Sequence, residues 1–176
     1  MKKGQLISMS LLLGLFFIFS GCKKDSPPLT PARNLVGTWK TVNPAKFRYK
    51  TDYCDFVNKI DVGTADWNIT WVITENPSDE NKVNITMTFA TSNYQPISTA
   101  CGFDNGYVPQ VSPIFNMEAS ISSTSITIQE LSGGSAYTFE GEFISDNIKG
   151  TWDSFYNGIY YSGEYTLTDG LILSRQ

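Results

Sequence analysis

The chemistry open to this 176-residue chain is limited first by an absence, because the chain contains no histidine. Ser-His-Asp and Cys-His catalytic groups are therefore excluded, as are His-ligated zinc, copper and non-haem iron sites. Carboxylates remain as an acid/base pair, and Glu140, Glu142 and Asp153 are the candidates. Glu140 and Glu142 alternate with Tyr137 and Phe139, which places the two carboxylates on the opposite, solvated face of a strand. We therefore predict no enzyme and no catalytic residue.

Acidic residues also cluster at Asp52, Asp55, Asp61 and Asp66. Calcium prefers such oxygen ligands, but their order lacks the D-x-D-x-D-G pattern of an EF-hand loop. A solvated loop is the simpler interpretation. We predict no metal and no cofactor.

The first 21 residues have the three parts of a secretory signal peptide. Lys2 and Lys3 form the positive region, and Leu6 to Phe19 form an apolar core of 14 residues. That core is shorter than the roughly 20 residues that a membrane-spanning helix needs. We expect residues 1–21 to be removed, residues 22–32 to form an extended, proline-rich tether, and residues 33–176 to form one domain.

Cys22 directly follows Phe19-Ser20-Gly21, and this junction resembles the lipobox of bacterial lipoproteins. The resemblance implies that Cys22 carries several acyl chains, such as palmitate, which together make membrane attachment stable. Lys23-Lys24-Asp25 is similar to the start of Bacteroidetes lipoproteins, many of which reach the outer membrane. We expect a lipid anchor there, on the periplasmic or the cell-surface side. The alternative is an ordinary signal peptide with a coincidental cysteine.

With Cys22 lipidated, Cys54 and Cys101 remain. Outside the cytoplasm, two remaining cysteines favour a disulfide bond, although two separate buried thiols are an alternative. The pair lacks the C-x-x-C spacing of a redox site.

The charge of the mature chain bears on its partners. Two of the 13 basic residues, Lys2 and Lys3, lie in the leader, which leaves 11 against 17 acidic residues and a net charge of about −6. Because no basic block exists, we predict no nucleic-acid partner.

The mature sequence shows two-residue alternation of apolar and polar residues and almost no helical period. This pattern predicts an all-β fold, a single up-and-down antiparallel barrel of about eight strands. The expected strands are Leu35–Val42, Trp67–Thr74, Lys82–Thr91, Ile114–Ile121, Ser125–Leu131, Ala136–Ile144, Asn147–Phe155 and Ile159–Thr168.

Two expected connections, residues 43–66 and 92–113, are unusually long, which is typical of functional loops. Residues 46–60 have loosely helical spacing, which allows a short helix there. In a meander the first and third connections open at the same end, so these two are expected to share one rim. An extra strand within 43–66 would remove this parity argument.

The stretch Leu35 to Lys40 contains Gly37-Thr38-Trp39, and Gly-x-Trp on a first strand resembles the calycin group, which includes lipocalins, fatty-acid-binding proteins and avidins. By this resemblance Gly37 allows a close chain approach, and Trp39 closes one end of the barrel. Lipocalins commonly cover this tryptophan with an arginine from the last strand. The only late arginine is Arg175, which lies past the turn at Asp169-Gly170.

Aromatic residues gather in the connections expected at the shared rim. They are Tyr49, Tyr53, Phe56, Tyr94, Phe103, Tyr107, Tyr156 and Tyr160. Ring walls with polar tips suit a small apolar ligand or a sugar, whereas the simpler alternative is that these rings pack the loops. Trp67, Trp71 and Trp152 are predicted to fill the core.

Two functions follow from these patterns. The first is a membrane-anchored envelope lipoprotein that binds a small hydrophobic or carbohydrate ligand in the barrel mouth. The alternative is a non-enzymatic scaffold subunit of an outer-membrane complex that captures nutrients or glycans, with an outer-membrane protein as its partner.

Overall fold

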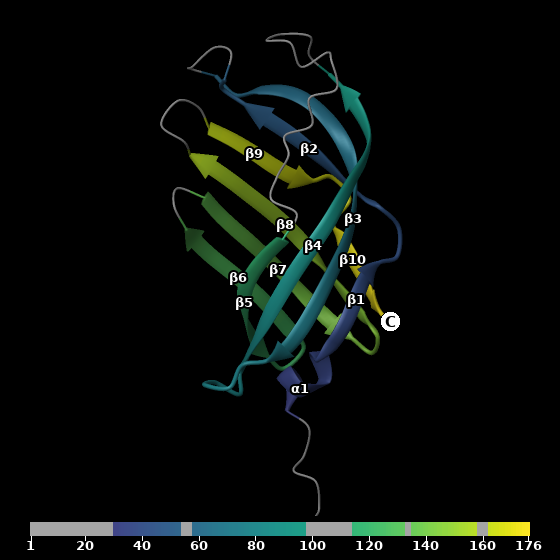
Figure 1. The fold of residues 1–176 in the computed structure, drawn as a ribbon, viewed down its shortest axis with the longest axis vertical. Coiled ribbons are helices and arrows are strands. Elements are labelled where there is room, and N and C mark those ends of the chain that lie inside the picture. The colour runs from purple at the N-terminus through teal and green to yellow at the C-terminus, as the bar shows by residue number, and fades with distance from the viewer. Residues whose placement is uncertain (1–29, 54–57, 98–113, 133–134, 158–161) are drawn as a thin grey trace, which may run out of the picture.

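The computed structural model describes residues 30–53, 58–97, 114–132, 135–157 and 162–176 (Figure 1). One short helix precedes ten antiparallel strands within these ranges. The elements are α1 (Pro31–Leu35), β1 (Gly37–Thr41), β2 (Ala45–Thr51), β3 (Ile60–Glu75), β4 (Lys82–Pro96), β5 (Ile114–Ser122), β6 (Ser125–Ser132), β7 (Ser135–Ile144), β8 (Asn147–Asn157), β9 (Ser162–Leu167) and β10 (Leu171–Arg175). The fold is a closed antiparallel β-barrel, as predicted.

The barrel closes because its first and last strands are each divided in two. β1 pairs with β3 and β10, whereas β2 pairs with β3 and β9. On the other side, both β9 and β10 pair with β8. β1 continues into β2, and β9 continues into β10, so each of these two pairs occupies one position in the wall. The ten strands therefore fill eight positions, which is the number predicted.

The prediction for residues 43–66 is wrong. This stretch contains β2 and the first part of β3, and the connection between them comprises only residues 52–59. The short helix considered within residues 46–60 is absent from the described part, because Ala45, Phe47 and Tyr49 are buried while Lys46 and Arg48 are exposed. This alternation requires a strand with one face in the core.

The two connections still leave from one end of the barrel, opposite α1, as the ends of β2 and β4 show in Figure 1. The parity argument survives because β2 continues the direction of β1 and adds no reversal of the chain. Cys54 and Cys101 lie outside the described residues, so their disulfide bond stays a prediction.

The core consists of the inward-facing residues, which alternate with outward-facing residues along the strands. Trp67, Trp71 and Trp152 are all buried, which confirms their predicted place in the interior. The end near α1 is the most tightly closed, because Leu35 and Trp39 are fully buried there and α1 packs against β3, β4 and β5. Trp39 lies directly opposite Trp71 in the β1–β3 ladder.

Phe139 lies over two glycines that face each other across β7 and β8. Gly141 pairs with Gly150, and a Cβ added at Gly150 would lie 2.5 Å from Cζ of Phe139 and 2.4 Å from the carbonyl oxygen of Glu140. The fully buried Phe139 ring in turn meets Trp71 edge-to-face, with ring centroids 5.1 Å apart. The two glycines therefore allow an aromatic ring to cover the strand backbone.

We predict that Gly150→Ala lowers the free energy of unfolding by about 1–3 kcal/mol, because the added methyl group overpacks a site bounded by backbone. Thr151→Val, at the exposed neighbouring position, is the control and should change stability by about 0.5 kcal/mol or less. Urea denaturation followed by tryptophan fluorescence measures both. Equal stability of the Gly150→Ala variant and the parent chain would contradict the packing described.

Candidate functional site

Eight aromatic side chains form a continuous series of ring contacts inside the barrel, which we call the aromatic belt. They come from seven different strands: Phe47 and Tyr49 of β2, Trp67 of β3, Phe89 of β4, Phe115 of β5, Tyr137 of β7, Trp152 of β8 and Tyr165 of β9. All occupy inward positions of the two-residue alternation, so the belt follows directly from the strand pattern.

The ring contacts within the belt are close. The centroid of Trp67 lies 3.9 Å from that of Phe47 and 4.6 Å from that of Phe89. Phe89 and Phe115 stack with their planes 14° apart, and Phe115 meets Tyr137 at a centroid distance of 5.1 Å. Offset-stacked and edge-to-face pairs of this kind are the favourable aromatic geometries.

On the β2 and β9 side of the belt, Tyr49 stacks on Tyr165 with centroids 4.6 Å apart. Tyr165 also lies 5.8 Å from Phe47, which joins this pair to the rest of the belt. These contacts cross the β2–β9 closure, because Tyr49 and Tyr165 are direct partners in that ladder.

Half of the belt is only partly buried, although every ring points inward. Phe89, Phe115, Tyr137 and Tyr165 all keep intermediate exposure. By contrast, Trp39 and Trp71 near α1 are fully buried. Solvent therefore reaches part of these four belt side chains, but it does not reach the two tryptophans near α1.

Three indole nitrogens in the interior lack a hydrogen-bond acceptor among the described residues. These are the Nε1 atoms of Trp67, Trp71 and Trp152. Trp39 differs, because its Nε1 donates to the carbonyl oxygen of Leu35 at 2.7 Å. A buried indole N–H normally finds an acceptor, so an unsatisfied group needs an explanation. Two of the three tryptophans belong to the belt, so hydrogen-bond donors adjoin the partly exposed rings.

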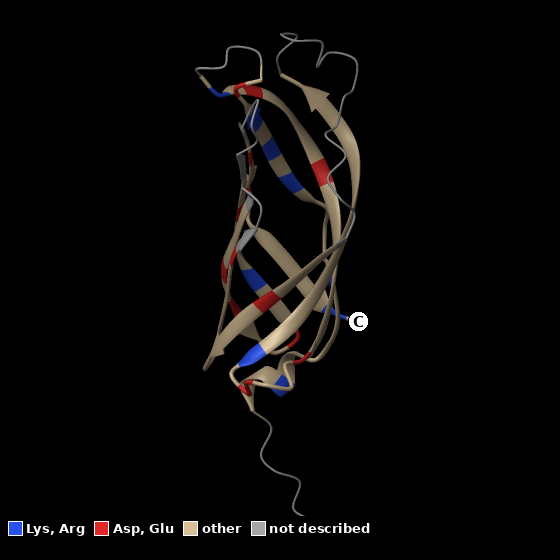
Figure 2. Cartoon of the chain, turned by 60° about the vertical axis from the view of Figure 1, so that its left-hand side comes forward, with Lys and Arg blue, Asp and Glu red and all other residues tan. Residues whose placement is uncertain are grey.

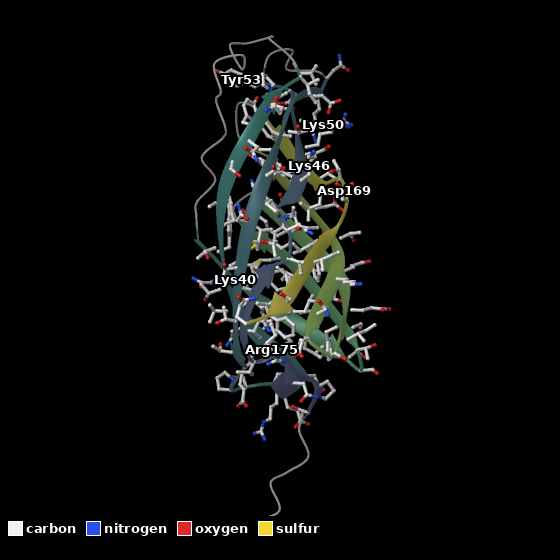
Figure 3. All side chains as sticks on the ribbon, turned by 90° about the vertical axis from the view of Figure 1, so that its right-hand side faces the viewer. Lys40, Lys46, Lys50, Tyr53, Asp169 and Arg175 are labelled. Atoms are coloured by element: carbon white, nitrogen blue, oxygen red, sulfur yellow. The ribbon has the colours of Figure 1, made fainter. Side chains whose placement is uncertain are left out.

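Only some of the predicted rim residues can be placed. Tyr49 belongs to the belt, and Tyr53 is exposed at the end away from α1 (Figure 3). Tyr94 lies half-buried against Gly63 on β3, and this burial raises the pKa of its phenol. Tyr156 lies on β8, although its side chain is outside the described structure. Phe56, Phe103, Tyr107 and Tyr160 lie outside the described residues, so a site at the rim stays a prediction.

The ligand-binding residues predicted from the sequence lie mostly in connections, whereas the belt residues lie in strands. Phe47 lies in β2, a strand within the predicted connection 43–66, and Tyr165 lies in a predicted strand whose partner is this β2. The alternation of Phe47 and Tyr49 with Lys46 and Arg48 was the available signal.

The α1 end has a compact arrangement around Trp39 and Gly37. The Arg175 guanidinium lies 4.5 Å from the centre of the Trp39 ring and donates from Nη1 to the carbonyl oxygen of Val36 at 3.0 Å. Its Nη2 donates to the carbonyl oxygen of Asn34. Gly37 has a φ of +141°, a conformation that favours glycine. The arginine that seemed misplaced in the sequence thus covers Trp39, because β10 carries it back beside β1.

Charged residues of β2, β7 and β8 lie on the outer wall. Glu140, Glu142 and Asp153 are exposed, as expected from the alternation. Lys46, Arg48 and Lys50 follow one another along the outer face of β2 (Figure 2), and Arg48 pairs with Asp61 at 3.3 Å. Within the described ranges no group of three or more acidic or cysteine residues is arranged to hold a metal ion. No helix of the described residues has the length and apolar character to span a membrane.

Comparison of the chain with protein-family models, curated proteins and solved structures finds no match. The function is therefore argued from the site itself.

We predict that Arg175→Met lowers the free energy of unfolding by about 1–2 kcal/mol, because it removes two charged hydrogen bonds and a cation–π contact at a partly exposed site. Asp146→Asn is the matched control. Asp146 pairs with Arg175 at 3.2 Å but is well exposed, so its loss should cost less than about 1 kcal/mol. Urea denaturation compares the two, and a larger effect of Asp146→Asn would contradict this account.

Proposed function

We propose that this chain is a membrane-anchored envelope lipoprotein with a lipocalin-like domain, which binds a small apolar or sugar-like ligand against the aromatic belt. The observation that carries the proposal is the set of inward-pointing rings that keep partial exposure: Phe89, Phe115, Tyr137 and Tyr165. Rings from several strands converging inside a barrel are a typical lining for a small-molecule site.

The unpaired indole groups indicate which ligands fit best. A purely aliphatic ligand would leave the N–H groups of Trp67 and Trp152 without acceptors. A ring-shaped ligand with hydroxyl, ether or carbonyl oxygens would both stack on the rings and accept from these donors. This combination favours an oxygen-bearing ligand, such as a sugar or an oxygenated hydrophobic ring.

The assignment to the calycin group is supported by the closed end of the barrel. Gly37, a buried Trp39 and a covering Arg175 together match the pattern that the Gly-x-Trp resemblance implies. This likeness concerns the scaffold, so it transfers no ligand to this chain.

The lipid anchor rests on the leader. Cys22 and the tether precede α1, which packs at the closed end of the barrel. An acylated Cys22 would therefore attach the domain by the end opposite the connections 52–59 and 97–113, and the ring-lined end would stay accessible from the envelope space.

Native mass spectrometry of the full-length protein, purified in detergent from its source membranes, tests the proposal directly. We expect a retained small molecule of constant mass that is released on unfolding. An empty protein in every preparation, together with no binding of the fluorescent probe 1-anilinonaphthalene-8-sulfonate, would reject a ligand-binding role.

We predict that Tyr137→Leu and Phe115→Leu each weaken binding of this probe by several-fold to about tenfold. Leucine keeps apolar volume but removes the ring, and an aromatic pair contributes about 0.5–1.5 kcal/mol beyond its buried area. Thr138→Ala, on the exposed face of β7 next to Tyr137, is the control and should leave the affinity unchanged. Fluorescence titration measures all three, and unchanged affinity in both leucine variants would place the probe away from the belt.

A further inference from the structure

A row of polar side chains crosses the interior of the barrel at the level of the aromatic belt, and we call it the polar row. It runs over the neighbouring strands β6, β7, β8, β9 and β2 (Figure 1), and the ladders place each member directly opposite the next: Glu130, Tyr137, Ser154, Tyr165 and Tyr49. Direct partners in an antiparallel ladder lie on the same face of the sheet. The polar row therefore occupies five of the eight strand positions of the wall.

Glu130 contributes the carboxylate of the polar row. Ile126 and Ile128 precede it at two-residue intervals and are fully buried, whereas Gln129 between them and Glu130 is exposed. Glu130 thus continues the inward face of β6, opposite the belt residue Tyr137. Glu130 is half-buried and also lines a groove over β4, β5 and β6, so water has access to this carboxylate.

Among the described residues, the belt offers this carboxylate no opposite charge. The charged residues at inward strand positions near α1 are paired, Glu75 with Arg33 and Arg175 with Asp146. At the belt, no lysine or arginine of the described strands occupies an inward position, and no described basic residue forms an ion pair with Glu130. An anionic group on a ligand would therefore be repelled by Glu130, with no cation of the described residues to offset the repulsion.

Trp152 supplies the complementary group beside the same tyrosine. Its ring centroid lies 6.2 Å from that of Tyr137, and the residue is only 3% exposed. Its Nε1 lacks an acceptor among the described residues. An indole nitrogen only donates hydrogen bonds, and an ionised carboxylate only accepts them. A ligand that lies on Tyr137 must therefore donate toward Glu130 and accept from Trp152.

We propose that Glu130 makes the aromatic belt selective for neutral sugars and excludes anionic ligands, such as fatty acids and acidic sugars. This inference rests on the ligand site proposed at the belt and narrows the ligand class of that site. A hydroxyl group both donates and accepts, so the hydroxyls of one sugar can satisfy Glu130 and Trp152 while a ring face stacks on Tyr137. An ammonium ligand would satisfy Glu130 alone, because it has no acceptor for the indole.

The exclusion of anions is tested with two fluorescent probes that share the same rings. N-phenyl-1-naphthylamine is uncharged, whereas 1-anilinonaphthalene-8-sulfonate carries one sulfonate. Energy transfer from the tryptophans reports binding of each probe to the full-length protein in detergent, with detergent alone as the blank. We expect Glu130→Gln to tighten binding of the sulfonate probe by about fivefold or more, because a like charge is removed from a partly solvated site. Binding of the uncharged probe should change by less than about twofold, since it carries no charge to be repelled.

Glu140→Gln is the matched control, because it removes the same charge from the exposed outer face of β7. It should leave the affinity for both probes unchanged. If the parent chain binds the uncharged probe but Glu130→Gln affects the sulfonate probe no more than Glu140→Gln does, the role of Glu130 is overturned and the belt stays a ligand site. If the parent chain binds neither probe, the belt itself is rejected as a ligand site, and the selectivity proposed here with it.

The sugar class is tested with phenyl glycosides, which keep the aromatic group constant while the sugar varies. The glucoside, galactoside, mannoside and N-acetylglucosaminide are neutral, whereas the glucuronide carries a carboxylate. Displacement of N-phenyl-1-naphthylamine measures their binding. We expect at least one neutral glycoside to bind about tenfold more tightly than the glucuronide. Glu130→Gln should reduce this preference by about fivefold or more, because it weakens the contact with the hydroxyl groups and removes the repulsion of the carboxylate.

Three outcomes would overturn the assignment to neutral sugars. They are binding of the glucuronide or of laurate at least as tightly as every neutral glycoside, failure of all neutral glycosides to displace a probe that does bind, and an unchanged preference in the Glu130→Gln variant. Because glutamine has the shape of glutamate without its charge, the variant tests the charge at this position and keeps the packing of the polar row.

Discussion

The structure depends on completing a ring of backbone hydrogen bonds, since an open sheet would leave the edges of its first and last strands exposed. The chain completes the ring with two bent strands. β2 closes on β9 at one level, and β1 closes on β10 at another. Asp169-Gly170 and residues 42–44 interrupt the strands at the bends, and Gly170 adopts a positive φ of 76° there. Each bend lets one strand position serve two levels of the barrel.

The two levels of closure have different interiors. Near α1, the β1–β10 closure brings Arg175 over Trp39, and the space is filled by fully buried side chains. At the β2–β9 closure, Tyr49 and Tyr165 stack on each other and continue into a belt of rings that solvent partly reaches. Large aromatic residues occur at both levels, so composition alone does not separate a filled core from an accessible one. The level of these residues in the barrel separates the filled core from the accessible one.

Much of the fold was predictable because a buried face forces strict alternation, and β3 to β8 show it clearly. β2 lies in a stretch for which the sequence predicts a long connection that allows a short helix, although Phe47 and Tyr49 alternate correctly with Lys46 and Arg48. β10 was missed because five residues after a turn carry a weak pattern. The position of Arg175 depended on that strand, so its contact with Trp39 could not be predicted. The belt likewise required the register between strands, which sets the neighbours of Phe89 and Phe115 and which single-strand patterns do not contain.

The partial exposure of the belt also reflects how the wall pairs. Among the described residues, β5 and β6 pair only from Ser122 opposite Ser125 to Ala119 opposite Ile128, although both strands continue beyond that pair. Phe115 lies beyond the last pair on β5, and its ring contacts Tyr137 of β7. Both rings keep intermediate exposure, whereas Trp39, on a strand that pairs with β3 and with β10, is fully buried. The accessible rings therefore lie where the described pairing of the wall is incomplete.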